Sequence, residues 1–149
     1  MSNKDKFIMF FQKLEKANIK STKECFKDLA KAITSDIDES LFEILKDFLI
    51  LDISGLNRFE IIKLNDKQKK IIENSKLYRY EYRKYSNLRI IFLLKLDNKV
   101  ILICAFNENA GKNKSKDSYK RNIERALNII KRIKGGVDNE NKWKSIGRF

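Results

Sequence analysis

Apolar residues recur at helical spacing through the first 50 positions of the chain. They predict three amphipathic helices, at about 7–17, 22–33 and 37–50, each with one apolar stripe. Ser21, with Glu24 three residues later, has the spacing of a capping box and predicts where the second helix begins. The first third of the chain should therefore be helical.

Two shorter signals follow the third helix. Gly55 marks the end of that helix, and the segment 56–64 fits a strand as well as a helix. Asn65 with Gln68 forms another capping signal, which predicts a short helix that reaches Asn74. The pattern therefore does not decide whether 56–64 forms a strand or a helix.

The periodicity changes from helical to alternating at Leu77. Charged residues alternate with tyrosines over 77–85, so the two sets lie on opposite faces of a strand. The charged set is Arg79, Glu81 and Arg83, and the tyrosine set is Tyr78, Tyr80 and Tyr82. We expect the tyrosines to pack against the helices as core residues.

Two apolar segments after this strand predict two further strands. Residues 88–96 and 100–106 are rich in branched side chains and follow short polar turns, so the three strands should form an antiparallel meander. A polar loop at 107–118 then leads to a helix at about 119–134. The predicted fold class is α+β, with a helical N-terminal half, an antiparallel meander and a C-terminal helix.

The length of 149 residues fits one domain. Within it we expect a mainly helical part at 1–75, the sheet, basic loop and helix at 77–134, and a tail at 137–149. The net charge is +13, and it is unevenly spread: residues 1–75 carry 14 basic and 13 acidic side chains, whereas residues 76–149 carry 19 and 7. Such a basic half favours a polyanionic partner, most commonly a nucleic acid.

Several classes of site are excluded by composition. The chain has no histidine, which excludes Ser-His-Asp and Cys-His catalysis and metal sites that need an imidazole. Cys25 and Cys104 are too few for a four-cysteine zinc site and lie among apolar residues, as reduced core cysteines do. No segment has the pattern of a membrane span or a secretory signal. We therefore expect a cytoplasmic protein without metal or cofactor.

The densest group of cations lies between Gly111 and Arg121. It comprises Lys112, Lys114, Lys116, Lys120 and Arg121, with Tyr119 among them. If this loop folds over the charged face of the first strand, next to Arg89 of the second, these side chains would line one concave surface. The alternative is a solvated lysine-rich loop.

The segment from Leu77 to about Lys134 resembles the toxins of type II toxin–antitoxin systems, in the RelE/HigB group of ribosome-dependent mRNA interferases. The resemblance rests on LYRYEYR with Glu81 and Arg83, on NLRIIFLL with Arg89, and on ILICAFNEN followed by GKNKSKDSYK with Tyr119. It covers roughly 60 of the 149 residues. Such toxins usually open with a short strand and a two-helix hairpin, so the helix predicted at 7–17 is an addition.

The resemblance implies RNA cleavage by attack of the 2′-hydroxyl on the adjacent phosphate. Because histidine is absent, fixed cations would supply most of the transition-state stabilisation. The implied catalytic set is Arg83 and Arg89 as a phosphate clamp, Glu81 or Glu108 as general base, and Tyr119 for stacking or proton transfer. The implied RNA-contacting set is Arg79, Glu108, Lys112, Lys114, Lys116, Lys120 and Arg121. The implied partners are mRNA on the ribosome and a cognate antitoxin protein.

Alternatives stay open for residues and for function. Glu81 could form an ion pair with Arg79 or Arg83, and Tyr119 could be a core residue. Arg89 begins an otherwise apolar strand, so it needs either a phosphate or a carboxylate as its partner. For the whole chain, the alternatives are a non-catalytic nucleic-acid-binding or regulatory module and a gyrase-inhibiting relative of the same fold.

Overall fold

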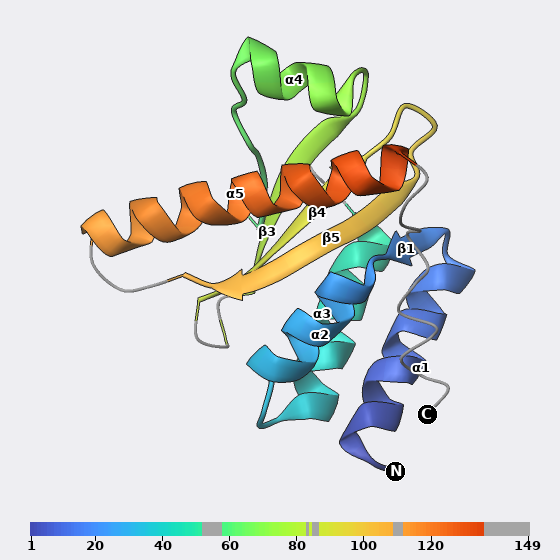
Figure 1. Cartoon of the computed structure of the whole chain (residues 1–149). Coiled ribbons are helices and arrows are strands. Elements are labelled where there is room, and N and C mark those ends of the chain that lie inside the picture. Colours follow the sequence, from blue (N-terminus) through green and yellow to red (C-terminus); the bar gives the residue numbers. More distant parts are fainter. Residues whose placement is uncertain (52–57, 83, 85–86, 109–111, 136–149) are drawn as a thin grey trace.

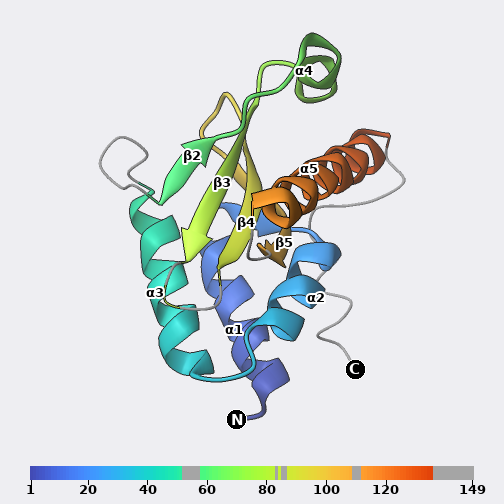
Figure 2. The ribbon, with the colours of Figure 1, turned by 90° about the vertical axis from the view of Figure 1, so that its left-hand side faces the viewer.

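The computed structural model describes residues 1–51, 58–82, 84, 87–108 and 112–135, with only the backbone for 112–117. Its elements are α1 (Asn3–Lys16), β1 (Ile19–Ser21), α2 (Lys23–Ala32), α3 (Ile37–Ile50), β2 (Phe59–Ile61), α4 (Asp66–Ile72), β3 (Lys76–Tyr82), β4 (Leu88–Leu94), β5 (Val100–Asn107) and α5 (Lys112–Lys134). Helices α1, α2 and α3 lie on one side of the sheet and α5 crosses the other (Figure 1, Figure 2). The expected α+β class is confirmed.

The sheet has five strands in the order β1-β5-β4-β3-β2. Strands β3, β4 and β5 pair antiparallel, as the meander prediction requires, with Glu81 opposite Arg89 and Arg89 opposite Phe106. β2 adds an antiparallel edge next to β3, so the ambiguous segment 56–64 contains a strand. β1 pairs parallel with β5 and was not predicted, because three residues between two helices carry no readable period.

The face toward α1, α2 and α3, called here the three-helix face, has an aromatic core. The ring of Phe48 on α3 lies 5.6 Å from that of Phe59, 4.9 Å from that of Tyr80 and 5.3 Å from that of Phe92, between centroids. The buried tyrosines Tyr78, Tyr80 and Tyr82 belong to this cluster, which confirms their predicted core role. Two of them also hold α3, since the hydroxyls of Tyr80 and Tyr82 donate to carboxylates of Asp47 and Glu43, each at 2.6 Å.

The opposite face, called here the α5 face, has an aliphatic core beneath α5. It includes Ile91, Leu93, Ile103, Leu127 and Ile130. The two cysteines divide between the cores, Cys25 on the three-helix face and Cys104 on the α5 face, and both are buried free thiols as predicted. Burial raises the pKa of Cys104 to about 12 and that of Cys25 well above its usual value.

Two predicted element boundaries are wrong. The N-cap of α2 is Thr22, whose hydroxyl accepts from the Cys25 amide at 3.1 Å, because Ser21 is already paired in β1. Residues 107–118 are not a loop throughout, since α5 begins at Lys112. Lysine is a good helix former, and the apolar stripe that revealed the helix starts only where the helix reaches the sheet. The capping box of Asn65 and Gln68 is confirmed at the start of α4.

Helix α2 protects the edge of β5 beyond the short strand β1. Thr22 donates its amide to Leu102 O at 3.0 Å and its hydroxyl to Ile103 O at 2.5 Å. The Asp28 carboxylate accepts from the Ala105 amide at 2.9 Å and from the Arg125 guanidinium of α5 at 2.7 and 3.1 Å. Side chains thus take the place of a further strand and join α2 to α5 around the sheet edge.

Candidate functional site

The charged residues of the α5 face meet at one end of the sheet. Arg79 and Glu81 come from β3, Arg89 from β4, Glu60 from β2 and Glu108 from the residue after β5. The strand register places them side by side, because Glu60 pairs with Arg79 and Glu81 pairs with Arg89. These five residues are called here the arginine–glutamate group.

Arg89 lies deepest in this group. Its side chain is 9% exposed, its Nη2 donates to Glu108 Oε2 at 2.9 Å, and its Nε lies 3.6 Å from Glu81 Oε1. Its Nη1 also donates to the Leu88 carbonyl oxygen at 3.2 Å. Of the two partners left open by the sequence, a phosphate or a carboxylate, the structure provides the carboxylate.

Arg79 joins the remaining acids and contacts the last helix. It forms ion pairs with Glu60 and, at 3.1 Å, with Glu81, and its Nη1 lies 3.9 Å from Glu108 Oε1. Its guanidinium carbon lies 5.0 Å from the ring centroid of Tyr119 on α5, within cation–π range. The ion pair considered for Glu81 is therefore present, and Tyr119 is a half-buried residue that covers an arginine.

Three carboxylates thus surround two guanidinium groups, which leaves one net negative charge among these described side chains. Both arginine Nε atoms are buried and make no hydrogen bond within the described part of the chain. Burial raises the pKa of Tyr119 against the opposing effect of Arg79. The phenol therefore stays protonated at neutral pH, so it can donate a proton but not accept one.

The structure brings together only part of the predicted site. Arg79, Glu81, Arg89, Glu108 and Tyr119 converge as expected. Arg83 lies outside the described residues, as do the side chains of Lys112, Lys114 and Lys116, although their backbone is helical. Lys120 and Arg121 are exposed on α5. The cations from Lys112 onward are therefore carried by a helix, and the prediction of a loop as far as residue 118 is wrong.

Glu60 is the member of the group that the sequence did not single out. It lies in β2, within the segment whose pattern fitted both helix and strand. Without the strand assignment, no register could place it next to Arg79. A cross-strand partner becomes visible only when both strands and their alignment are known.

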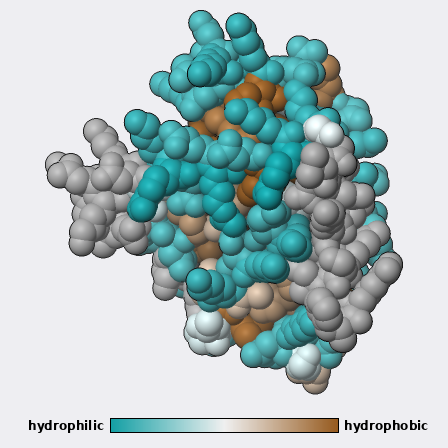
Figure 3. Space-filling model, in the orientation of Figure 1, coloured by the Kyte–Doolittle hydropathy of each residue, from teal (hydrophilic) through white to brown (hydrophobic). Residues whose placement is uncertain are grey.

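The outer surface of α5 is polar and mostly basic. Hydrophilic side chains cover most of this side of the molecule, with apolar surface on both sides of α5 (Figure 3). Among the described side chains of α5, the exposed cations are Lys120, Arg121, Lys131, Arg132 and Lys134. Two of them bind acids elsewhere in the chain, Arg132 with Glu24 of α2 at 2.9 Å and Lys134 with Glu73, at the end of α4, at 2.5 Å. This surface lies beside the arginine–glutamate group, since Tyr119 of α5 contacts Arg79.

Comparison with known proteins identifies no relative. No protein-family model, no curated protein and no solved structure matches the chain. Within the described residues, no helix is long and apolar enough to cross a bilayer, and no group of three or more acidic or cysteine side chains could hold a metal ion. The chemistry of the site must therefore be argued from its own geometry.

Proposed function

We propose that this chain is an RNA-binding endoribonuclease of the type II toxin kind, acting on mRNA at the ribosome and controlled by an antitoxin protein. The observation that carries the proposal is the meeting of Arg89, Glu81, Glu108 and Tyr119 on one sheet face. The short strand β1 followed by α2 and α3 ahead of the meander is compatible with the opening of RelE/HigB toxins. The excess of basic residues supports a phosphate-bearing substrate.

The proposed reaction needs a base, an acid and a phosphate clamp. A phosphate of RNA takes the place of a carboxylate beside Arg89 and Arg79. Glu108 or Glu81 accepts the proton of the 2′-hydroxyl while the oxygen of this hydroxyl attacks phosphorus. The bond to the 5′-oxygen breaks, and this oxygen takes a proton from the neutral phenol of Tyr119. The products are a 2′,3′-cyclic phosphate and a 5′-hydroxyl, and a proton transfer from the glutamic acid restores the phenol.

A second candidate function is a non-catalytic nucleic-acid-binding module. It is favoured by the occupation of both arginines by Glu60, Glu81 and Glu108, which makes the group an internal ion-pair network. RNA binding would then rest on the exposed cations of α5. The two functions differ in whether Tyr119 takes part in bond cleavage.

The deciding experiment measures binding and cleavage separately. Ribosomes carrying mRNA are incubated with the purified chain, cleavage is mapped by primer extension, and RNA affinity is measured over a salt series. We expect cleavage by the natural chain, a loss of about a hundredfold in Tyr119→Phe with unchanged affinity, and affinity that falls steeply with salt. Lys120→Gln is the matched control on α5 and should reduce affinity alone, by a modest factor.

The outcomes separate the two functions. Salt-dependent binding without cleavage by the natural chain would establish the binding module and reject the nuclease. Equal cleavage by the natural chain and by Tyr119→Phe would reject the role of the phenol. For the toxin assignment, expression of the chain in bacteria should arrest growth, and harmless expression of the folded protein without a partner would count against it.

A further inference from the structure

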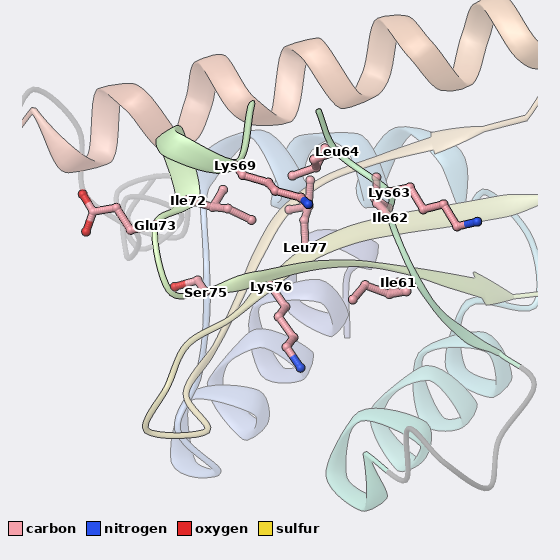
Figure 4. A pocket seen from close by; sticks show the side chains of 10 residues that line it. All are labelled: Ile61, Ile62, Lys63, Leu64, Lys69, Ile72, Glu73, Ser75, Lys76 and Leu77. Atoms are coloured by element: carbon pink, nitrogen blue, oxygen red, sulfur yellow. The ribbon is translucent and has the colours of Figure 1, made fainter. Parts of the chain in front are cut away.

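A pocket lies beneath α4, at the end of the sheet opposite the arginine–glutamate group. Its volume is about 470 Å³, within the range of small-molecule sites. It is lined by Ile61, Ile62, Lys63, Leu64, Lys69, Ile72, Glu73, Ser75, Lys76 and Leu77 (Figure 4). These residues come from β2 and the segment after it, from α4 with the residues that follow it, and from the start of β3.

The lining combines an aliphatic part with a rim of cations. Ile62, Ile72 and Leu77 are buried members of the α5-face core and Leu64 is partly buried against it, whereas Ile61 pairs with Tyr78 and points to the opposite face of the sheet. The partly buried Leu64 beside these aliphatic residues provides apolar surface that a ligand could remove from water. This surface favours a ligand with a hydrocarbon body.

Three lysines surround this apolar lining. Lys63, Lys69 and Lys76 are exposed, and none of their ammonium groups forms a hydrogen bond or ion pair within the described chain. In Figure 4 the side chain of Lys69 reaches from α4 over the middle of the pocket, while those of Lys63 and Lys76 point to other sides. The acid of the rim, Glu73, is already bound by Lys134 at 2.5 Å. The pocket therefore offers positive charge to an anion.

We propose that this pocket binds a small amphipathic organic anion, with its apolar body on Ile62, Leu64 and Leu77 and its carboxylate or phosphate head at Lys69. A nucleobase fits the pocket less well, because its lining contains no aromatic side chain on which a base could stack. The inference is independent of the proposed nuclease function, since no residue of the arginine–glutamate group lines the pocket.

The first test compares an anion with a neutral molecule of the same chain length. Octanoate and 1-octanol are titrated into the full chain by calorimetry, and methyl NMR signals locate the site. We expect octanoate to bind about two- to fivefold more tightly than octanol, the gain expected of a partly exposed ion pair, and to shift the methyl groups of Ile62, Leu64 and Leu77. Equal affinities, or shifts confined to other methyl groups, would overturn the proposal.

The second test uses matched variants. Lys69→Gln should weaken octanoate about two- to fivefold and leave octanol unchanged, whereas Lys67→Gln, on α4 but outside the lining, should change neither. Leu64→Ser should weaken both ligands, and Leu96→Ser, which alters a 77% exposed apolar side chain elsewhere, should weaken neither. If Lys69→Gln and Lys67→Gln changed the affinity for octanoate equally, octanoate would respond only to the general surface charge. That result would contradict the proposal.

A further arm separates a free anion from a lipid headgroup. Anionic phosphatidylglycerol vesicles and neutral phosphatidylcholine vesicles are sedimented with the chain, with and without octanoate. Competition between octanoate and anionic vesicles would assign the pocket to a lipid source, and octanoate binding without sedimentation would assign it to a free anion. Loss of the Lys69→Gln effect in both assays would remove the site altogether.

Discussion

The two faces of the sheet are shielded from water in different ways. Three helices cover the three-helix face, and its core of 23 buried described residues is rich in aromatic rings. The α5 face is covered by α5 together with the short helix α4, which contributes Ile72, and its core has 13 buried described residues, all of them aliphatic or cysteine. On the first face tyrosine hydroxyls and Arg58 bind carboxylates of α3, whereas on the second face buried arginines pair with glutamates.

This difference has a simple geometric cause. Five strands spaced by about 4.8 Å span about 20 Å, while a helix with its side chains is about 10 Å wide. A single helix therefore covers about half of the α5 face, and next to β2 and β3 only the short helix α4 adds to this cover. Both the arginine–glutamate group and the pocket beneath α4 lie on this side. The less covered face is thus the one on which a ligand can reach the sheet.

The largest effect is expected from removal of an aromatic ring of the three-helix face. Phe48→Ala should lower the free energy of unfolding by about 4 kcal/mol. The ring of Phe48 contacts the rings of Phe59, Tyr80 and Phe92, and its removal leaves a cavity between them. Phe42→Ala, on the same helix but 67% exposed, should change it by less than about 0.5 kcal/mol. Urea denaturation followed by circular dichroism measures both, and similar losses would contradict the assigned core.

A somewhat smaller loss should follow removal of a charge from the α5 face. Arg89→Ala should lower the free energy of unfolding by about 3 kcal/mol, because Glu108 and Glu81 lose their buried partner. Combined with Glu108→Gln, the loss should be smaller than the sum of the two single losses. Lys99→Ala breaks the exposed pair with Asp97 and should cost less than about 1 kcal/mol. Normal stability of Arg89→Ala together with lost cleavage would instead favour a purely catalytic arginine.

The smallest expected effect is a difference between the rates at which the two cores open. Cys25 reports on the three-helix face and Cys104 on the α5 face, and the raised pKa values of both thiols keep them protonated and unreactive in the folded chain. In dilute urea at pH 8 we expect maleimide to modify Cys104 several-fold faster than Cys25, because the smaller core of the α5 face opens at lower free-energy cost. Mass spectrometry of Cys25→Ala and Cys104→Ala measures each rate, and faster modification of Cys25 would reverse the comparison.

Much of the fold could be predicted because local patterns agree with the packing. The alternation of tyrosines and charges in β3 correctly separated the core face from the charged face, and the apolar runs of β4 and β5 gave the meander. The hydrophobic pattern failed where an element has too few buried residues to give a periodic pattern in the sequence. The first turns of α5 extend beyond the apolar stripe, and β1 is three residues long.

The sequence by itself determined the α+β class, the absence of histidine chemistry and the basic second half of the chain, because each depends on composition or on neighbouring residues. It also placed Arg79 and Glu81 on one face of β3. Only the tertiary structure decided their partners. Glu60 reaches Arg79 through the β2–β3 register, and Glu108 reaches Arg89 from the end of β5. Ion pairs between distant segments form where strands align, and strand alignment depends on the packing of the whole sheet rather than on any local pattern.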